Sequence, residues 1–279
     1  MPAIIDAHHH LWLYNLVDYE WMDESMEVLK RDYTPADLEK EMGKSGVDGT
    51  VVVQARQLIE ETTWLLEMAE QNSFIKGVVG WLDLQSDELR SQLDLFASHP
   101  KLVGVRHVIH DEPDDDFMLR PAFVKGIELL QNYNLTYDLL LFPKHLDRAL
   151  ELVNMFPEQR FVLDHISKPF IKAGILEPWK GDMEALASQA NVWCKISGMV
   201  TEADLNKWKY QDFVPFMQSV VEAFGTDRIM LGSDWPVCLL AGTYSKVYQL
   251  VYNFTKTLST FEQEAIFGNN AFRFYQRKI

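Results

Sequence analysis

The amino-acid sequence predicts an α/β protein built as a single (β/α)₈ (TIM) barrel. Eight short β-rich runs alternate with eight longer amphipathic stretches, and 279 residues is a suitable length for one such barrel. No Gly-, Ser- or Pro-rich linker interrupts the alternation, so we expect one domain over residues 1–279. Hydrophobic residues make up 47% of the chain, which is enough for the large core that a barrel requires.

The expected strands are nearly continuous apolar runs, which is typical of parallel strands covered on both faces. Thr50-Val51-Val52-Val53 is a clear example. In chain order, the expected strands are Ala3–His10, Gly49–Ala55, Ile75–Leu82, Leu102–Val108, Leu135–Leu141, Arg160–His165, Val192–Ser197 and Arg228–Asp234.

The stretches between these runs carry apolar residues at helical spacing. The expected helices are Pro35–Lys44, Thr62–Gln71, Asp87–Ser98, Arg120–Asn132, Lys144–Phe156, Met183–Gln189, Asp212–Phe224 and Ser245–Thr257. Two elaborated loops also stand out, Leu11–Tyr33 after the first strand and Ile109–Phe117 after the fourth. Both follow strand ends, the side on which barrel enzymes build their active sites. The acidic run His110–Asp116 in the second loop is equally compatible with a solvated surface loop.

Composition and charge exclude several classes of partner. A formal charge of −15 and a pI near 4.9 argue against nucleic acid or an anionic membrane. No apolar run reaches the ~18 residues of a membrane span, and the first residues lack the pattern of a secretory signal. Cys194 and Cys238 lie far apart, so we expect buried thiols in a reducing, cytoplasmic protein. A homo-oligomer remains open.

Polar residues gather at the ends of these apolar strands. Ionisable side chains are costly to bury there unless they pair or bind something. His8 and His10 project from the same face of the first strand, roughly 6.5 Å apart, and can reach one ion or one polarised oxygen. The strand-end polar residues are His8, His10, Gln54, Arg106, His107, Tyr137, Asp138, His165, Lys195 and Asp234. Because parallel strand ends meet at one mouth of a barrel, these residues predict a catalytic pocket rather than scattered polar caps.

Several of these residues stand in motifs that resemble the amidohydrolase superfamily. They are Asp6-x-His8-x-His10, Arg31-Asp32-Tyr33-Thr34-Pro35, Val53-Gln54-Ala55, Gly104-Val105-Arg106-His107, Tyr137-Asp138, Val162-Leu163-Asp164-His165-x-x-Lys168-Pro169, Cys194-Lys195-Ile196-Ser197-Gly198 and Gly232-Ser233-Asp234-Trp235-Pro236. Within the superfamily, the chain is similar to the sugar-lactonase branch, which includes L-fuconolactonases, L-rhamnonolactonases and 2-pyrone-4,6-dicarboxylate lactonases. The resemblance spans nearly the whole chain.

The resemblance implies that His8, His10, His165 and Asp234 surround the reacting centre. Three neutral imidazoles and a carboxylate suit one divalent metal ion, with zinc the first choice. Such an ion lowers the pKa of bound water from about 15.7 to about 7. The same four residues also serve a metal-free scheme of the kind attributed to the pyrone lactonases. No early lysine has the context of a bridging carbamate, so we expect at most one metal.

The resemblance also assigns individual roles. Asp234 is the expected general base, with a structural turn residue as the alternative. Arg106 and Lys195 supply positive charge for the oxyanion or the sugar oxygens, unless they form a salt bridge of the barrel. Asp138 is expected to contact a sugar hydroxyl, since Tyr137 occupies the opposite face of its strand. The remaining candidates for substrate contact are Gln54, Trp81 and Trp235, with Trp12 and Trp21 also near the mouth. His9 and His107 are expected to face away from the barrel interior.

The function implied is the opening of a sugar-derived lactone to its hydroxy acid by an activated water. A metal-dependent decarboxylase of an aromatic or muconate-type carboxylate is the main alternative, because it uses a similar barrel and ligand cluster. The segments Val162–Pro169 and Lys195–Gly198 favour the lactonase. A non-catalytic ligand-binding barrel is the alternative from another class, and the joint presence of the four candidate catalytic residues argues against it.

Overall fold

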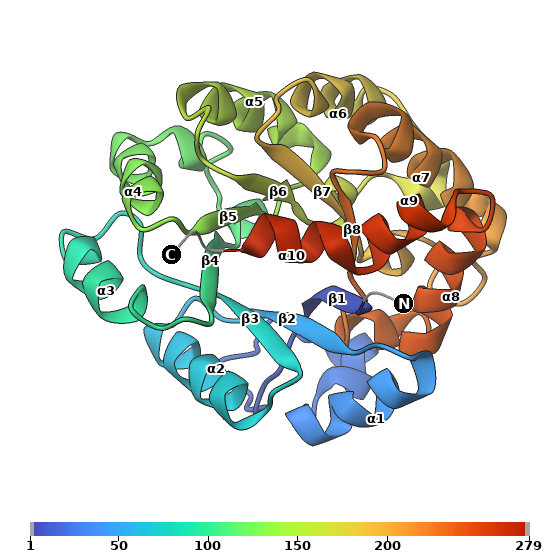
Figure 1. Cartoon of the computed structure of the whole chain (residues 1–279), viewed down its shortest axis with the longest axis horizontal. Helices are drawn as coiled ribbons and strands as arrows, with labels where there is room; N and C mark the ends of the chain where they lie inside the picture. Colours follow the sequence, from blue (N-terminus) through green and yellow to red (C-terminus); the bar gives the residue numbers. More distant parts are fainter. Residues whose placement is uncertain (1–2, 277–279) are drawn as a thin grey trace.

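A computed structural model describes residues 3–276 and shows eight parallel strands that pair in sequence order around a barrel (Figure 1). The strands are β1 (Ile5–His9), β2 (Gly49–Val53), β3 (Ile75–Gly80), β4 (Leu102–His107), β5 (Thr136–Leu139), β6 (Phe161–Leu163), β7 (Val192–Ile196) and β8 (Ile229–Leu231). Every expected strand is present, and the predicted (β/α)₈ architecture is confirmed. All eight strands are shorter than predicted, by one to four residues, because the chain leaves the sheet and enters the loops before the end of each apolar run.

Backbone contacts at the ends of β1 and β8 close the barrel. The Asp234 amide donates to the carbonyl of His8 at 2.8 Å, and the His10 amide donates to the carbonyl of Trp235 at 2.6 Å. His9 and Trp235 form an isolated parallel bridge. These contacts bring the first and last strand ends, more than 220 residues apart in sequence, to one place.

The helices that alternate with the strands form the outer layer of the barrel. They are α1 (Pro35–Ser45), α2 (Ile59–Gln71), α3 (Leu89–Phe96), α4 (Pro121–Asn132), α5 (Leu146–Met155), α6 (Trp179–Ala187), α7 (Tyr210–Phe224) and α8 (Tyr244–Thr255). Each expected helix is present. Helix α6 begins four residues before the predicted start, because buried Trp179 opens it and donates from Nε1 to the carbonyl of Ile166 at 2.8 Å.

Short helical turns fill the loops, and a C-terminal segment adds helices that the sequence analysis did not predict. The turns are η1 (Glu24–Leu29), η2 (Ile109–Asp111), η3 (Phe117–Leu119), η4 (Pro143–His145), η5 (Asp164–Ser167), η6 (Ile171–Ala173), η7 (Met199–Glu202) and η8 (Val237–Leu240). The C-terminal helices are α9 (Thr260–Glu264), the π-helix η9 (Ala265–Asn269) and α10 (Asn270–Tyr275). Helix α10 crosses the end of the barrel at which the strands begin, as Figure 1 shows.

The core has an inner and an outer part. Inside the barrel, apolar side chains from several strands meet residues of α10 in one buried cluster, of which Val51, Val162, Met230, Phe274 and Tyr275 are members. A larger cluster packs between the strands and the surrounding helices. Helix α10 therefore serves as the floor of the barrel interior.

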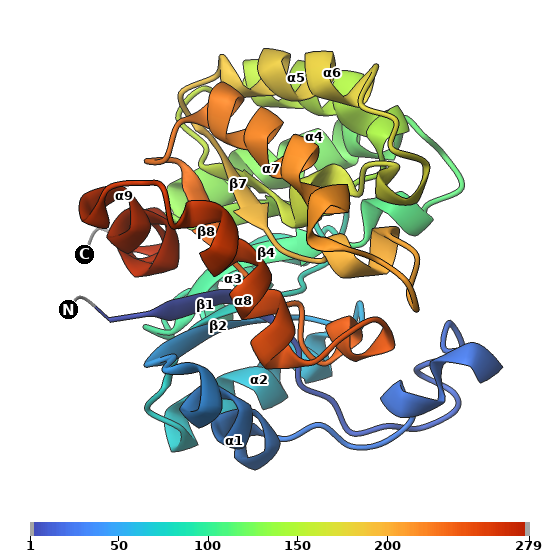
Figure 2. The same cartoon turned by 90° about the vertical axis from the view of Figure 1, so that its right-hand side faces the viewer.

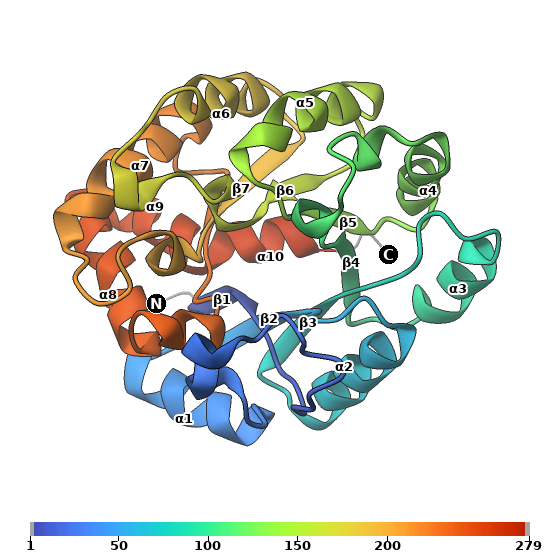
Figure 3. The ribbon, with the colours of Figure 1, turned by 180° about the vertical axis from the view of Figure 1, so that it is seen from behind.

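The two ends of the barrel have different roles. Figure 2 shows the chain ends beside the strand beginnings, whereas the long connection between β1 and α1 lies at the opposite end. Figure 3 looks onto that opposite end, where the loops that follow the strands gather. The loops after β1 and β4 thus lie on the side that the sequence predicted.

Two remaining sequence predictions concern the cysteines and the membrane. Cys194 and Cys238 are both buried free thiols, as expected, and burial raises the pKa of each thiol. Among residues 3–276, no helix combines the length and apolar character needed to cross a bilayer.

Candidate active site

Three histidines and one aspartate meet at the loop end of the barrel, as the sequence predicted. The Nε2 atoms of His8 and His10 lie 3.2 Å apart. Asp234 Oδ1 lies 3.4 Å from His10 Nε2, 3.8 Å from His165 Nε2 and 4.0 Å from His8 Nε2. All four residues are at most 5% exposed. The four side chains therefore present their reactive atoms to one small volume.

Asp6 fixes the two chain segments that carry His8 and Asp234. Its carboxylate accepts hydrogen bonds from the Ser233 amide at 2.8 Å, the Ser233 hydroxyl at 2.6 Å and the Tyr244 hydroxyl at 3.0 Å. The amide of His8 donates to the same carboxylate at 3.1 Å. Burial raises the pKa of Asp6, although these hydrogen bonds oppose that rise. Asp6 thus positions the site without facing it.

A left-handed turn carries His165 into the site. The four residues 165–168 have φ between 47° and 58°, a region that costs an L-residue roughly 1–2 kcal/mol each. The Lys168 amide closes the turn by donating to the carbonyl of His165 at 2.9 Å. Because the chain reverses its handedness here, the consecutive residues Asp164 and His165 both face the barrel interior. Asp234, three residues after β8, also has a left-handed backbone, with φ of 57°.

Hydrogen bonds to the Nδ1 atoms orient two of the rings. His10 Nδ1 lies 2.8 Å from the carbonyl oxygen of Val53, which can only accept, so the proton sits on Nδ1 and the Nε2 lone pair faces the site. His165 Nδ1 lies 2.9 Å from the Ser197 hydroxyl. Gly198 lies against the His165 ring: a Cβ on this residue would stand 2.4 Å from His165 Nδ1. Such supporting contacts hold imidazoles in the orientation that a ligand or a substrate requires.

Four charged side chains form a buried network beneath His8. Asp164 Oδ1 lies 2.9 Å from Lys195 Nζ and 3.2 Å from His8 Nδ1, while Asp164 Oδ2 accepts from Arg106 Nη1 at 3.0 Å. Lys195 also donates to Asp138 at 2.5 Å. Burial opposes the charge of Asp164, yet Lys195, His8 and Arg106 hold the pKa of Asp164 well below its usual value. The two cations therefore balance two carboxylates in the interior.

Asp164 was not predicted as a site residue. It stands beside His165, and strand alternation would place the two side chains on opposite faces. The left-handed turn removes that alternation. The only hint in the sequence is the presence of two ionisable residues directly after the apolar Phe161–Leu163.

Burial also determines the charge state of two rings. The pKa values of His8 and His165 lie well below the ordinary histidine value, mainly because burial penalises the imidazolium form. Both rings are therefore neutral near pH 7. Neutral imidazoles offer lone pairs, which is what metal coordination or hydrogen bonding to a substrate requires.

A cavity of about 700 Å³ opens above this cluster. His10, Arg106, His165 and Asp234 line its base. Apolar residues line part of the wall: Trp12, Trp21, Met26, Leu58, Leu140, Leu205, Val237 and Leu240. Charged or ionisable residues line another part: Asp18, Arg56, His110, Asp111, Lys168 and Glu202. The cavity thus suits a small molecule with both hydroxyl-bearing and apolar surfaces.

Five residues that the sequence analysis expected to touch a substrate do not line this cavity: Gln54, Trp81, Asp138, Lys195 and Trp235. Asp138 and Lys195 are fully buried below it, where they pair with each other. Gln54 is also buried and supports Arg106, whose Nη2 donates to Gln54 Oε1 at 2.9 Å. Lys195 therefore forms a salt bridge inside the barrel, which was the alternative to a role at the substrate. Arg106 also forms a salt bridge, with Asp164, although it lines the cavity.

The two tryptophans of this set lie beside the site. Trp81 donates from Nε1 to His107 Nδ1 at 3.2 Å, so it is engaged on the outer side of β4. Trp235 is buried and packs edge-on against Tyr33, with ring centroids 5.0 Å apart. Packing is the common fate of a buried tryptophan. Trp12 and Trp21, from the first elaborated loop, are the tryptophans that do line the cavity.

Residues expected to point outward do so. His9 Nε2 lies 3.0 Å from the Thr50 hydroxyl, away from the catalytic cluster. His107 stacks on Phe117 with centroids 4.7 Å apart and pairs with Glu112 at 2.7 Å. The face assignments for the first and fourth strands are therefore confirmed at these positions.

The acidic run after β4 has one part at the active site and one part in a solvated surface loop. His110 and Asp111, joined at 2.7 Å, line the cavity. Asp114, Asp115 and Asp116 instead form ion pairs with basic residues at the surface: Arg120, Lys144 and Arg148. Only the first part of the run contributes to the site.

The donor set fits one zinc-like ion. His8, His10 and Asp234 each offer an atom, and these atoms lie within 4.8 Å of one another. Tetrahedral zinc with ligands about 2.05 Å away keeps its donor atoms about 3.3 Å apart. The observed His8–His10 and His10–Asp234 separations are 3.2 and 3.4 Å, and the His8–Asp234 separation is longer, at 4.0 Å. His8 Nε2 and His10 Nε2 approach each other, and a cation between them would accept a lone pair from each ring.

Comparisons with known proteins show which family the chain resembles over its length. The family model described as Amidohydrolase matches residues 5–277. The chain is 36% identical to an L-fucono-1,5-lactonase of Burkholderia ambifaria over 283 residues, which cover 99% of this chain and 96% of that protein. A second L-fucono-1,5-lactonase, from Burkholderia multivorans, is also 36% identical, over 97% of this chain and 95% of the relative.

Solved structures extend the comparison to three dimensions. A crystal structure of an amidohydrolase from Burkholderia multivorans with bound zinc has a TM-score of 0.96 at 36% identity, covering 99% of this chain and 100% of the other. The 5-carboxyvanillate decarboxylase of Sphingomonas paucimobilis shares the fold alone, with a TM-score of 0.66 at 14% identity over the whole of both chains. From the family match and the full-length relatives, the chain belongs to the amidohydrolase family.

Proposed function

We propose that this enzyme opens a six-membered lactone of a sugar acid, L-fucono-1,5-lactone or a stereochemical relative, by adding water to the ester carbonyl. The product is the open-chain hydroxy acid. The chain is a lactonase, an assignment supported by its full-length similarity to two L-fucono-1,5-lactonases. The observation that carries the proposal is the meeting of three histidine Nε2 atoms around Asp234 Oδ1, within 3.4–4.0 Å, at the base of the cavity.

Asp234 is the proposed general base. Its carboxylate lies at the cavity base and is 3% exposed, so it can meet a water molecule without being surrounded by solvent. It takes a proton from that water as the water oxygen attacks the carbonyl carbon. After the tetrahedral intermediate forms, the same carboxyl group returns the proton to the ring oxygen as the C–O bond breaks.

Arg106 is the proposed electrostatic support for the oxyanion. It lines the cavity, and Asp164 and Gln54 hold two of its nitrogens, so its orientation is fixed before the substrate arrives. A preorganised cation stabilises charge as it develops in the transition state. Arg106 also remains beside the carboxylate that forms on ring opening.

A metal ion would add to this machinery. His8, His10 and Asp234 would hold it, with His165 nearby, and a bound zinc-like ion polarises a carbonyl and acidifies water. Arg106 Nη1 lies 3.4 Å from His8 Nε2 and offers that lone pair a second cationic partner. The proposal therefore includes activity without metal, since an ester needs less activation than an amide.

The cavity walls favour a deoxy sugar over a fully hydroxylated one. Apolar side chains such as Trp21, Leu205 and Leu240 line the same cavity as charged ones such as Lys168 and Glu202. A sugar lactone with a methyl group has a matching apolar edge and a hydroxyl-bearing edge. Burying one methyl group contributes about 0.8 kcal/mol, which is enough to bias selection severalfold.

A lactone panel tests the proposal. Acid release from 1,5- and 1,4-lactones of several sugar acids would be followed with a pH indicator, with and without chelator, against an enzyme-free blank for spontaneous hydrolysis. In parallel, ultraviolet absorbance would follow the loss of aromatic and muconate-type carboxylates. We expect enzyme-dependent acid release with sugar lactones. Decarboxylation without lactone hydrolysis would overturn the proposal in favour of a decarboxylase, and no turnover in either assay would favour a ligand-binding barrel.

A further inference from the structure

The active-site cavity has a polar wall formed by the loops after β4, β6 and β7. His110 and Asp111 follow β4, Lys168 follows β6, and Thr201 and Glu202 follow β7. The His110 ring and, to a smaller extent, Lys168 lower the pKa of Asp111, so charges from separate loops lie close together. The proposed reaction steps use none of these five side chains.

Of the two charged pairs in this wall, Lys168 and Glu202 form the more sheltered one. Lys168 Nζ lies 2.9 Å from Glu202 Oε1, and the two side chains are 17% and 21% exposed. Asp111, which pairs with His110, is 68% exposed. The Lys168–Glu202 pair is therefore surrounded mainly by protein, at the edge of the cavity that a substrate would fill.

The backbone fixes both members of this pair. Lys168 ends the left-handed turn of residues 165–168, and its amide donates to the carbonyl of His165 at 2.9 Å. Glu202 ends η7, the helical turn that begins directly after Gly198, the glycine packed against the His165 ring. The pair therefore stands at a defined place relative to His165, one of the four central residues.

The ion pair leaves hydrogen-bonding capacity unused. An ammonium group has three N–H donors, and Glu202 Oε1 is the one acceptor that Lys168 Nζ has among residues 3–276. Glu202 Oε1 also lies 3.4 Å from the Thr201 hydroxyl, whereas Glu202 Oε2 accepts from no side chain or amide within that range. A ligand in the cavity would thus meet donors and an acceptor side by side.

Two neighbouring hydroxyls of a sugar ring match this arrangement. A hydroxyl both donates and accepts, so one can accept from Lys168 while its neighbour donates to Glu202. Neighbouring hydroxyl oxygens in the gauche relation lie about one hydrogen-bond length apart, which is similar to the 2.9 Å between Lys168 Nζ and Glu202 Oε1. Two axial hydroxyls on opposite faces of the ring point apart and cannot reach both groups.

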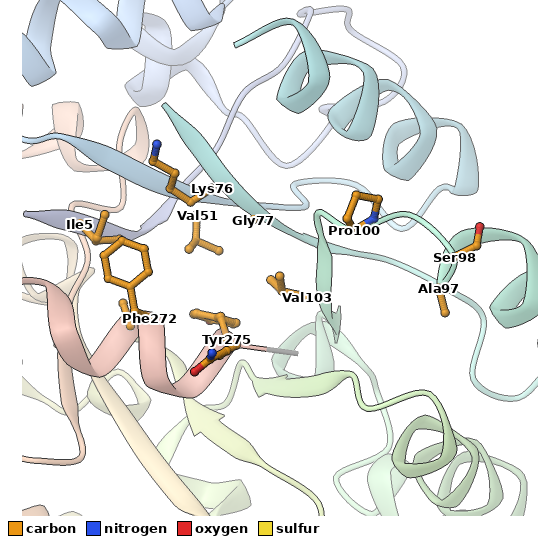
Figure 4. A pocket seen from close by; sticks show the side chains of 12 residues that line it. Ile5, Val51, Lys76, Gly77, Ala97, Ser98, Pro100, Val103, Phe272 and Tyr275 are labelled. Carbon is orange, nitrogen blue, oxygen red and sulfur yellow. The ribbon is translucent and has the colours of Figure 1, made fainter. Parts of the chain in front are cut away.

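Another large cavity of the barrel lacks such a pair. It measures about 740 Å³ and lies under the strand beginnings, where apolar side chains from β1, β2, β4 and α10 line most of it (Figure 4). No carboxylate lines it among the described residues. Its two ionisable residues are engaged elsewhere: Lys76 donates to the carbonyl of Ser73, and the Tyr275 hydroxyl donates to Asp138. Recognition of hydroxyls therefore belongs to the cavity above the catalytic cluster.

We propose that Lys168 and Glu202 determine which sugar lactones the enzyme accepts, by binding two neighbouring hydroxyls of the lactone ring. Lys168 donates to one hydroxyl oxygen, and the next hydroxyl donates to Glu202. This inference rests on the proposed lactonase function and adds the part of the substrate that the enzyme recognises. The apolar wall of the same cavity remains available to the methyl-bearing edge of the ring.

The test compares Lys168→Met with the parent enzyme on a sugar lactone and on its 2-, 3- and 4-deoxy forms. Methionine keeps an unbranched side chain and removes the donors. On the fully hydroxylated lactone we expect kcat/KM to fall about 10- to 100-fold, the range for one hydrogen bond to a charged group, mainly through a higher KM. On the deoxy lactone that lacks the contacted hydroxyl, parent and variant should differ by less than about twofold.

Two further variants make the test specific. Lys180→Met removes an ion pair of the same two βα units, since Lys180 of α6 lies 3.7 Å from Glu222 of α7, but neither residue lines the cavity. It should keep the parent kcat/KM on every lactone. Glu202→Gln keeps the side-chain shape and removes the charge, so its loss should disappear with the deoxy lactone that lacks the neighbouring hydroxyl. It also serves as the test should Lys168→Met fail to fold.

The outcomes separate this inference from the proposed function. Equal losses on the hydroxylated lactone and on all three deoxy lactones would overturn the inference, because a pair that only shapes the loops affects every substrate alike. A parent enzyme that hydrolyses no lactone would overturn the proposed function. Calorimetric binding of a sugar lactam, with a ring N–H in place of the ring oxygen, would then decide the inference. Weaker binding to folded Lys168→Met would support it, and equal or absent binding would overturn it.

Discussion

Replacing Gly198 with alanine offers a sharp test of how His165 is held. Gly198 has φ of 60°, and a Cβ there would lie 2.4 Å from His165 Nδ1 and 2.5 Å from His165 Cγ. Ordinary contacts of this type are about 3.4 Å, so the ring must move by about 1 Å. That displacement would change the position of the His165 ring relative to Asp234 and the Ser197 hydroxyl.

The loss of stability expected for Gly198→Ala has two parts. A left-handed alanine costs roughly 1–2 kcal/mol, and overpacking a buried site costs about 1–3 kcal/mol. Together they lower the free energy of unfolding by about 2–5 kcal/mol, or about 4–10 °C in Tm for a protein of this size. Moving a catalytic group by about 1 Å can reduce the rate about 100-fold, and we expect a loss of that order in kcat/KM.

Thermal unfolding and lactone hydrolysis would measure the two parts, with Gly174→Ala as the matched control. Gly174 has φ of 66°, but a Cβ added there would meet no atom within 4 Å, so alanine pays only the conformational cost. We expect Gly174→Ala to lose about 2–4 °C and keep the parent kcat/KM. Equal stability and equal activity in the two variants would refute the packing argument for His165.

Two other predictions follow from the buried charges and the donor set. Burial opposes the charge of Asp164, but Lys195, His8 and Arg106 depress its folded-state pKa. Its stabilising contribution is therefore complete above the unfolded pKa of about 3.9 and is lost as the pH falls toward the folded value; urea unfolding between pH 7 and 3 should show that loss, and Asp164→Asn should reduce it. Zinc at about 100 times its Kd should stabilise the parent by about 2.7 kcal/mol, visible as a rise in Tm. An equal rise in His10→Asn would contradict the metal-site assignment.

The sequence predicted the barrel well because its evidence is repetitive. Each of the eight buried parallel strands corresponds to a run of apolar residues in the sequence. Each covering helix corresponds to apolar residues at helical spacing. His8, His10, His165 and Asp234 are polar groups at ends of such runs, and the resemblance to the amidohydrolase superfamily singled them out from the other strand-end residues. Closure of the barrel then brings them together.

Other features depended on geometry that no local pattern encodes. Asp164 faces inward because residues 165–168 turn left-handed, which breaks the alternation from which its direction would be inferred. Asp138 and Lys195 were expected at the substrate, yet each finds an opposite charge in the interior and remains below the cavity. Tyr275 enters from a helix that the sequence analysis did not include, so its contact with Asp138 was out of reach.

Turnover of L-fucono-1,5-lactone by Asp234→Asn is the most direct test of the central claim, that Asp234 activates water at the meeting point of the three histidines. Asparagine keeps the size of the side chain but cannot accept the proton, so we expect the parent to release acid and the variant to lose about 10²–10⁴-fold in kcat, with fold and KM retained. Hydrolysis by the folded variant at the parent rate would contradict the account.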